Sequence, residues 1–145
     1  MAKKAARPKV RLTKGDYQAL AGFRHALRQF LAFSEDAAAK AGLTAVQHQA
    51  LLAIKGMPQG AKAQVSVGDL AEWLGVRHHS CVGLVDRLEA LGLIRKRADP
   101  KDKRRVFLQL TARAERKLAA LSAVHRHELR RRAGALGALL AAIRQ

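Results

Sequence analysis

The chain has 145 residues, the size of a single domain, and 49% of them are hydrophobic, which is enough to bury a core. Its 28 Lys and Arg residues against 11 Asp and Glu residues give a net charge of +17, so the protein attracts polyanions such as nucleic acid or an anionic membrane. A single cysteine, Cys81, excludes an internal disulfide and a zinc site built from several cysteines.

The first 15 residues contain six cations and no acid. With little apolar surface to bury, they predict a basic arm that is flexible at least in part, either a solvated tail or an arm that touches phosphates. The segment lacks the apolar centre of a secretory signal, and the sequence has no run of about 18 apolar residues that would span a bilayer. We therefore expect a cytoplasmic protein.

Helical periodicity begins at Asp16, which we interpret as an N-cap, and ends before Gly42. Thr44 and Gln47 have the spacing of a capping box, which predicts the start of a second helix. The stretch 55–64 has two glycines, a proline and no periodicity, so we expect it to be a long loop.

A short helix is predicted from Ser66 to Gly75, and a longer one at 78–91 follows after only two residues. Two helices joined by so short a turn form a helix-turn-helix unit. The stretches 93–98 and 106–111 then have the composition and alternation of strands. This order of elements predicts a mainly α fold, an α+β winged helix.

A last long helix starts at Thr111 and runs towards the end of the chain. Its final part carries an apolar stripe that nothing later in the sequence covers, so we expect a partner surface there. The stripe consists of Leu136, Leu139, Leu140 and Ile143.

The helix at 78–91 is predicted to enter the major groove of DNA, because its core face is occupied by Cys81, Leu84 and Leu88 and its other face is free. Cys81 on that core face is interpreted as a small buried hydrophobe, with a redox switch as the alternative. The residues expected to touch or approach bases are Arg77, His78, His79 and Gly83, and those better placed for phosphates are Ser80 and Arg87. The alternatives are exposed histidines without a partner and, for Gly83, a helix defect that serves packing.

Seven cations and two acids lie between Leu93 and Arg105, where the two strands are joined. A solvated turn that only aids solubility is the simpler alternative, but a slim basic hairpin suits a narrow minor groove, whose negative potential attracts arginine. We assign Arg104 to the groove and expect Asp102 to hold a neighbouring guanidinium in a fixed pose through a bidentate bond. The flanking phosphates are assigned to Lys101, Lys103 and Arg105.

The stretch "LVDRL" at 84–88, Gly92-Leu93, "DPKDKR" at 99–104 and Leu110-Thr111 together resemble the multiple-antibiotic-resistance-regulator (MarR) family of bacterial transcription factors. The likeness extends over about 16–145. It implies a nucleoid-associated homodimer, usually a repressor, whose two winged domains bind a palindromic operator.

By the same resemblance, 16–42 and 112–145 are dimerisation helices and 43–111 is the DNA-binding region. The residues expected at the dimer interface are Leu20, Phe23, Leu136, Leu139, Leu140 and Ile143. The family also implies a small aromatic or phenolic effector. Residues that could line its pocket are Tyr17, Phe23, Phe30 and Trp73, although plain core packing is the simpler interpretation of each.

We expect no resident cofactor, because the histidines lack metal-ligand spacing, and no enzyme, because paired carboxylates, a nucleophile elbow and a phosphate-binding glycine loop are missing. A sequence-indifferent architectural nucleic-acid-binding protein explains the charge and the arm equally well. Competition between a specific duplex and random DNA separates the two functions.

Overall fold

The computed structural model describes residues 10–144, so most of the predicted basic arm lies outside the described residues. The described residues divide into two compact units, one at 33–127 and one formed by 10–32 together with 128–144. Two long helices belong partly to each unit: α1 (Lys14–Lys40) and α5 (Ala112–Ile143).

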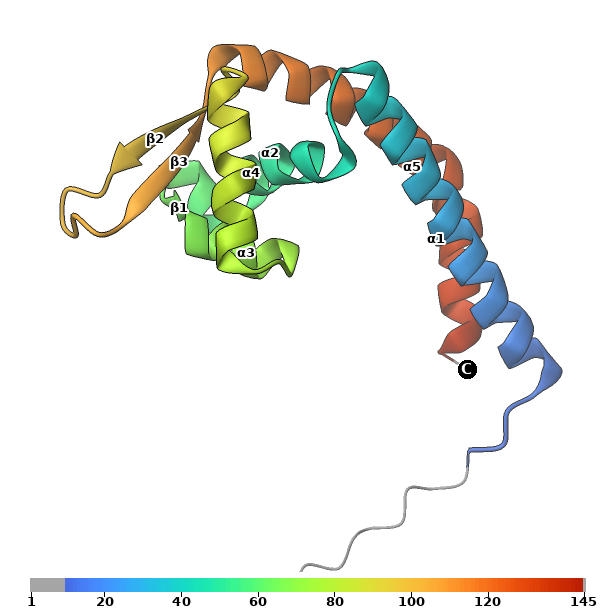
Figure 1. Ribbon diagram of the computed structural model, residues 1–145. Coiled ribbons are helices and arrows are strands. Elements are labelled where there is room, and N and C mark those ends of the chain that lie inside the picture. The colour runs from blue at the N-terminus through green and yellow to red at the C-terminus, as the bar shows by residue number, and fades with distance from the viewer. Residues whose placement is uncertain (1–9, 145) are drawn as a thin grey trace, which may run out of the picture. The chain divides into compact units, whose positions relative to one another are not determined.

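The unit at 33–127 contains a helix-turn-helix and a small sheet, which confirms the predicted winged-helix fold (Figure 1). The sheet is antiparallel with strand order β1-β3-β2. Its strands are β1 (Val65–Ser66), β2 (Ile94–Ala98) and β3 (Val106–Leu110). The helices are α2 (Ala45–Gly56), α3 (Val67–Leu74) and α4 (His78–Ala90), with a 3-10 helix η1 (Pro58–Lys62) between α2 and β1.

Side-chain caps fix where α2 and α3 begin. Thr44 and Ser66 each accept a hydrogen bond from the backbone three residues later, in complete capping boxes, as predicted. Gly75 ends α3 with φ at 67°, a left-handed conformation that glycine adopts without steric cost.

The start of α1 was predicted wrongly at Asp16. The helix begins at Lys14, and Thr13 is the cap: its Oγ1 accepts from the Asp16 backbone N–H at 3.2 Å. Asp16 completes the box from inside the first turn, since its Oδ2 accepts from the Thr13 backbone N–H at 2.7 Å. The Thr-x-x-Asp spacing was visible in the sequence, and it favours Thr13 over Asp16 as the cap.

The predicted loop at 55–64 is also partly wrong. It contains η1, and the chain then enters β1, which pairs with β3 through Val65–Leu108 and Ser66–Phe107. A strand of two residues has no alternation that could reveal it, and only the pairing with a distant strand defines it.

The core of this unit is built from one fully buried leucine on each of several elements. Leu51 of α2, Leu70 of α3, Leu88 of α4 and Leu108 of β3 are all 0% exposed. Cys81 is equally buried, and its Sγ lies 3.6 Å from the Val67 carbonyl oxygen. Burial raises the pKa of its thiol, so the interpretation as a buried hydrophobe holds and a reactive thiolate is disfavoured.

In the other unit, the first part of α1 lies antiparallel to the last part of α5. Arg132 Nη1 donates to Gln29 Oε1 at 3.2 Å, and Leu139 lies so close to Gly22 that an added Cβ there would be 2.9 Å from its Cδ2. Glu128 is buried and accepts from Arg131 and Arg132 at 2.9 and 2.7 Å. The helix α5 continues through Gly134 and Gly137 because α1 supports it.

Within 33–127, two histidines join three helices. The rings of His48 on α2 and His125 on α5 are 4.7 Å apart, and His125 Nε2 is 2.7 Å from Ser34 Oγ on α1. His48 is only 4% exposed. Burial, and secondarily the nearby His125, lower the pKa of His48 below its ordinary value of 6.5.

Acidification is therefore expected to destabilise the protein. Because the pKa of His48 is lower in the folded chain, the unfolded chain binds this proton more tightly. The free energy of unfolding therefore falls as pH drops below about 6.5, by at most about 1.4 kcal/mol per pH unit for one proton. Thermal melts from pH 8 to pH 5 measure this slope. His48→Gln should flatten this slope, and a slope equal to that of the parent protein would contradict the assignment.

Candidate nucleic-acid interface

The first turn of α4 presents polar groups to solvent. Arg77 is the N-cap residue but makes no side-chain cap bond, so the first backbone N–H groups of the helix have no capping side chain. His78, His79 and Ser80 are exposed, while Cys81 anchors the opposite face. Free N–H groups at a helix start favour an anion such as a phosphate.

Gly83 lies on this outward face, one turn further along α4. An added Cβ there would meet nothing within 4 Å among the described residues, so packing inside the chain does not require a glycine. The alternative of a packing role is therefore wrong. Glycine costs helix stability, and a close approach of another molecule to the helix backbone would explain that cost.

Gly83→Ala is expected to separate stability from binding. The free energy of unfolding should rise by about 0.5–1 kcal/mol because alanine is the better helix former. Affinity for duplex DNA should fall, because the methyl group holds the helix away from the groove floor. Chemical denaturation tests the expected rise in stability, and DNA titration of the same preparation tests the expected fall in affinity. Tighter DNA binding by Gly83→Ala would show that Gly83 does not lie at the interface.

An acid on the outward face of α4 is neutralised from the neighbouring strand. Lys96 of β2 lies 2.5 Å from Asp86 Oδ1 and 3.6 Å from Glu89 Oε1. The hydrogen bond to Asp86 is the main cause that raises the pKa of Lys96, with a smaller part from Glu89. These bonds reduce the repulsion between α4 and a polyanion and join α4 to the strands that carry the wing.

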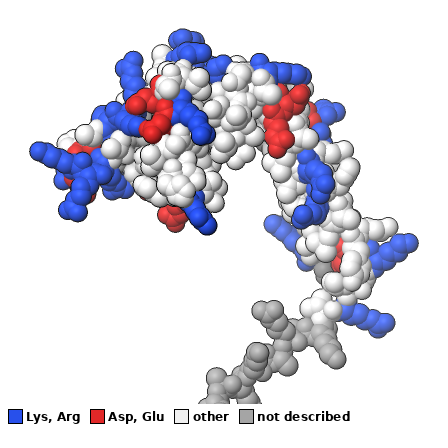
Figure 2. Space-filling view, in the orientation of Figure 1, with Lys and Arg blue, Asp and Glu red and all other residues white. Residues whose placement is uncertain are grey.

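The wing is the hairpin formed by β2, β3 and the turn at 99–105 (Figure 1). Asp99 is buried at its base, where its backbone N–H donates to the Arg105 carbonyl at 3.0 Å and its Oδ1 accepts from the Lys101 N–H at 2.8 Å. Lys101, Lys103 and Arg104 are exposed beyond this base, and the Arg104 side chain is 96% exposed. Figure 2 shows the Lys and Arg side chains that gather over the hairpin. Among the described residues, no acidic side chain pairs with Lys101 or Lys103, and Asp102 lies no nearer to the Arg104 guanidinium than 3.9 Å.

The predicted bidentate bond from Asp102 to a guanidinium is wrong. Asp102 Oδ1 accepts from the Arg104 backbone N–H at 3.0 Å and is 3.9 Å from Arg104 Nε. The carboxylate therefore shapes the turn, and the Arg104 side chain extends into solvent, 96% exposed. Arg105 differs from its neighbours, because its guanidinium lies beside Asp69 of α3.

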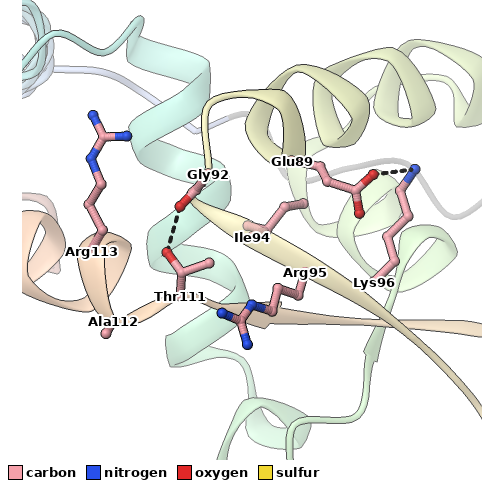
Figure 3. A pocket seen from close by; sticks show the side chains of 8 residues that line it. All are labelled: Glu89, Gly92, Ile94, Arg95, Lys96, Thr111, Ala112 and Arg113. Carbon is pink, nitrogen blue, oxygen red and sulfur yellow. Dashed lines mark hydrogen bonds and ion pairs between the residues drawn. The ribbon is translucent and has the colours of Figure 1, made fainter.

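A hollow of about 630 Å³ separates the end of α4 from the start of α5, with Arg95, Lys96 and Arg113 among its lining residues (Figure 3). Its cations do not converge: Arg95 and Arg113 point in different directions, and Lys96 is turned towards Glu89. Thr111 Oγ1 donates to the Gly92 carbonyl at 2.7 Å across the hollow. We therefore interpret the hollow as part of a structural junction, in which the Thr111–Gly92 hydrogen bond joins the start of α5 to the turn before β2.

The four aromatic residues predicted as core or pocket lining do not form one group. Trp73 is 58% exposed on α3, beside Leu52 and Gln49 of α2, and Tyr17 is 61% exposed on α1, so core packing is wrong for both. Phe23 and Phe30 are half-buried on α1 in the other unit. Long-range contacts decide which aromatic side chains are covered, and spacing along the sequence does not reveal them.

Among the helices of residues 10–144, none has the length and apolar character needed to cross a lipid bilayer. In the same part of the chain, no three His, Cys, Asp or Glu side chains gather as ligands for a metal ion.

The family model described as "MarR family" matches residues 41–105. Among solved structures, a MarR family transcription regulator is 25% identical, with a TM-score of 0.67 over 78% of this chain and 72% of that chain. CouR from Rhodococcus jostii, bound to p-coumaroyl-CoA, is 23% identical, with a TM-score of 0.63 over 74% and 73%. A mutant MarR from E. coli, complexed with operator DNA, is 20% identical, with a TM-score of 0.57 over 68% and 66%. No curated protein matches the sequence.

The helix-turn-helix, the three-stranded sheet and the exposed basic hairpin define a winged helix-turn-helix protein. Within that class, the resemblance to the MarR family of transcription regulators is confirmed. The assignments of individual residues to DNA, to a dimer interface or to an effector remain predictions.

Proposed function

We propose that the protein is a sequence-specific transcriptional regulator that binds a palindromic operator as a homodimer and represses transcription until a small ligand releases it. One observation carries this proposal. The start of α4, which has no side-chain cap, and the cation-rich tip of the wing belong to the same unit of the fold, and both are exposed. The start of α4 suits a major groove, and the tip of the wing suits the adjacent minor groove.

A second copy of the chain is the expected partner of the unit that contains the first part of α1 and the last part of α5. Leu20, Leu27 and Leu31 form an exposed stripe on α1, and Leu129, Leu140 and Ile143 are exposed on α5. These side chains remain 42–49% exposed although α1 and α5 already cover each other. Phe23, Leu136 and Leu139 are half-buried within the single chain, so Leu20, Leu140 and Ile143 are the stronger candidates for the interface. A two-fold dimer then requires half-sites about 34 Å apart.

A pocket of about 340 Å³ between α1 and α5, within 33–127, is the candidate effector site. Its walls are mostly apolar, with Phe33, Leu121 and Val124. Asp36, Lys40 and Lys117 also line it, and Lys40 is paired with Asp36 at 3.0 Å. None of the four aromatic residues predicted from the sequence lines it. An aromatic anion such as benzoate matches an apolar wall with one net positive charge among its polar lining residues, since Asp36 offsets one of the two lysines.

Ala120→Trp is expected to fill this pocket and to prevent release of DNA by aromatic acids. Benzoate and 4-hydroxybenzoate are titrated against the DNA complex of the parent protein and of the variant. Ala123→Trp, at an exposed position three residues along the same helix, is the matched control. If an acid that releases the parent also releases Ala120→Trp at the same concentration, the effector does not bind in this pocket.

Selection of duplexes from a random pool, followed by competition at matched salt, tests the proposed function. A palindromic motif should emerge, and the selected duplex should bind at least about a thousandfold more tightly than random DNA. If no motif emerges and random duplex competes equally, the protein is a sequence-indifferent binder, which the charge of +17 alone also explains.

A further inference from the structure

Arg105 has an environment unlike that of the other wing cations. Its Nη2 is 3.7 Å from Asp69 Oδ2, and its guanidinium carbon lies 5.6 Å from the centre of the Phe107 ring. The side chain is 49% exposed, whereas that of Arg104 is 96% exposed. The Arg105 guanidinium is thus held against the protein at the base of the wing.

Phe107 carries a second guanidinium from the other strand of the wing. Arg97 pairs with Phe107 across the β2–β3 ladder, and its guanidinium carbon lies 5.9 Å from the ring centre. Arg97 Nη2 also donates to the Ala63 carbonyl at 3.2 Å. The two arginines therefore share one ring, but only Arg105 is near an acid of the helix-turn-helix.

Asp69 connects several elements at once. It lies in the first turn of α3, and its Oδ2 accepts from the Ser66 backbone N–H at 3.0 Å. Burial alone would raise the pKa of Asp69, but hydrogen bonds from Ser66 and Gln59, together with the charge of Arg105, outweigh it and lower the pKa. The carboxylate therefore stays ionised and can hold Arg105 while it caps α3.

From this geometry we infer that Asp69 and Arg105 are positioning residues, which hold the wing at a fixed angle to the helix-turn-helix so that its tip and α4 reach DNA together. Arg105 then acts through the wing rather than as a phosphate ligand. This inference rests on the proposed DNA-binding function. It matters because the wing is a two-stranded hairpin, and a small rotation at its base displaces the cations at its tip.

Asp69→Asn separates positioning from simple electrostatics. Removal of an acid near a DNA-binding face should tighten binding if charge alone matters. If Asp69 positions the wing, the variant should instead bind the selected duplex about fivefold more weakly, with an unchanged dependence on salt. Asparagine keeps an oxygen that can accept from Ser66, so the cap on α3 is retained. Equal or tighter binding by Asp69→Asn overturns the inference.

Arg97→Gln is the matched control for Arg105→Gln, because both remove one cation that lies over Phe107. Arg105→Gln should cost more affinity than Arg97→Gln, and Asp69→Asn added to Arg105→Gln should cost nothing further. Arg105→Lys keeps the charge and should recover most of the affinity. The inference fails if Arg105→Gln instead lowers the slope of log affinity against log salt by about 0.9 and if the affinity losses of Arg105→Gln and Asp69→Asn add in the double variant. Arg105 is then a phosphate ligand.

Amide hydrogen exchange in the free protein gives a readout without DNA, so it succeeds or fails separately from the proposed function. The amides of Asp99 and Arg105 donate within the turn of the wing, to the carbonyls of Arg105 and Asp102. Asp69→Asn should accelerate their exchange and leave that of α4 unchanged. Exchange at the parent rate would show that the pair does not hold the wing.

Discussion

Leu140→Glu is expected to dissociate the protein into monomers and to weaken binding of the selected duplex by more than about a hundredfold. Leu140 is 46% exposed on α5, so a glutamate there is tolerated by the single chain. In a dimer the same position is covered, and an unpaired carboxylate buried among leucines opposes association. Each monomer would then bind a single half-site, and the gain in affinity that a dimer obtains from binding two half-sites at once would be lost.

The matched control is Ala138→Glu, which introduces the same charge on the same helix. Its exposed position is two residues away and therefore about 200° around the helix from Leu140. Sedimentation of both variants, with DNA titration, compares the two faces directly. If Leu140→Glu remains a dimer while Ala138→Glu dissociates, the interface lies on the other face of α5.

Arg104→Ala is expected to weaken operator binding by about tenfold and to reduce the slope of log affinity against log salt by about 0.9, the value of one phosphate contact. The Arg104 side chain is 96% exposed and its Nε is 3.9 Å from Asp102, so its removal should leave the fold intact. Because an arginine in the minor groove reads mainly its potential, the preferred motif should change little.

Arg126→Ala removes the same charge from the exposed surface of α5 and serves as the control. It should lower affinity only through the general field of the protein. Titrations at several salt concentrations distinguish the two variants. If both lose affinity and slope to the same extent, Arg104 acts as one charge among many, and its assignment to the groove is wrong.

Local signals in the sequence were sufficient for most of the fold. The capping boxes at Thr44 and Ser66 and the glycine at 75 are each local signals of a few residues, and the structure has them as expected. The strand β3 also forms, but burial along it does not alternate strictly, because Phe107 is buried as well as Leu108. The error at the start of α1 came from the choice between Thr13 and Asp16, which share one box. Such signals fix helix boundaries because caps act over a single turn.

The parts that could not be predicted depend on contacts between distant residues. The strand β1 exists only through its pairing with β3, and the exposure of Trp73 follows from how α2 and α3 lie together. The contact of Arg105 with Asp69 joins residues 36 positions apart in the chain, so the sequence showed two charges but not their pairing. For the same reason, the assignment of Arg105 to phosphates was made without knowledge of the acid beside it on α3.

Cleavage of DNA from a probe on the wing tests the central claim most directly. Cys81 is the single cysteine of the chain and is buried, so Lys103→Cys can be labelled selectively with an iron chelate at the exposed wing tip. On the selected duplex, cleavage should occur in the minor groove at two places related by the two-fold axis of the operator. Cleavage spread evenly along the duplex, or none at all while the protein is bound, would contradict insertion of the wings into the minor groove.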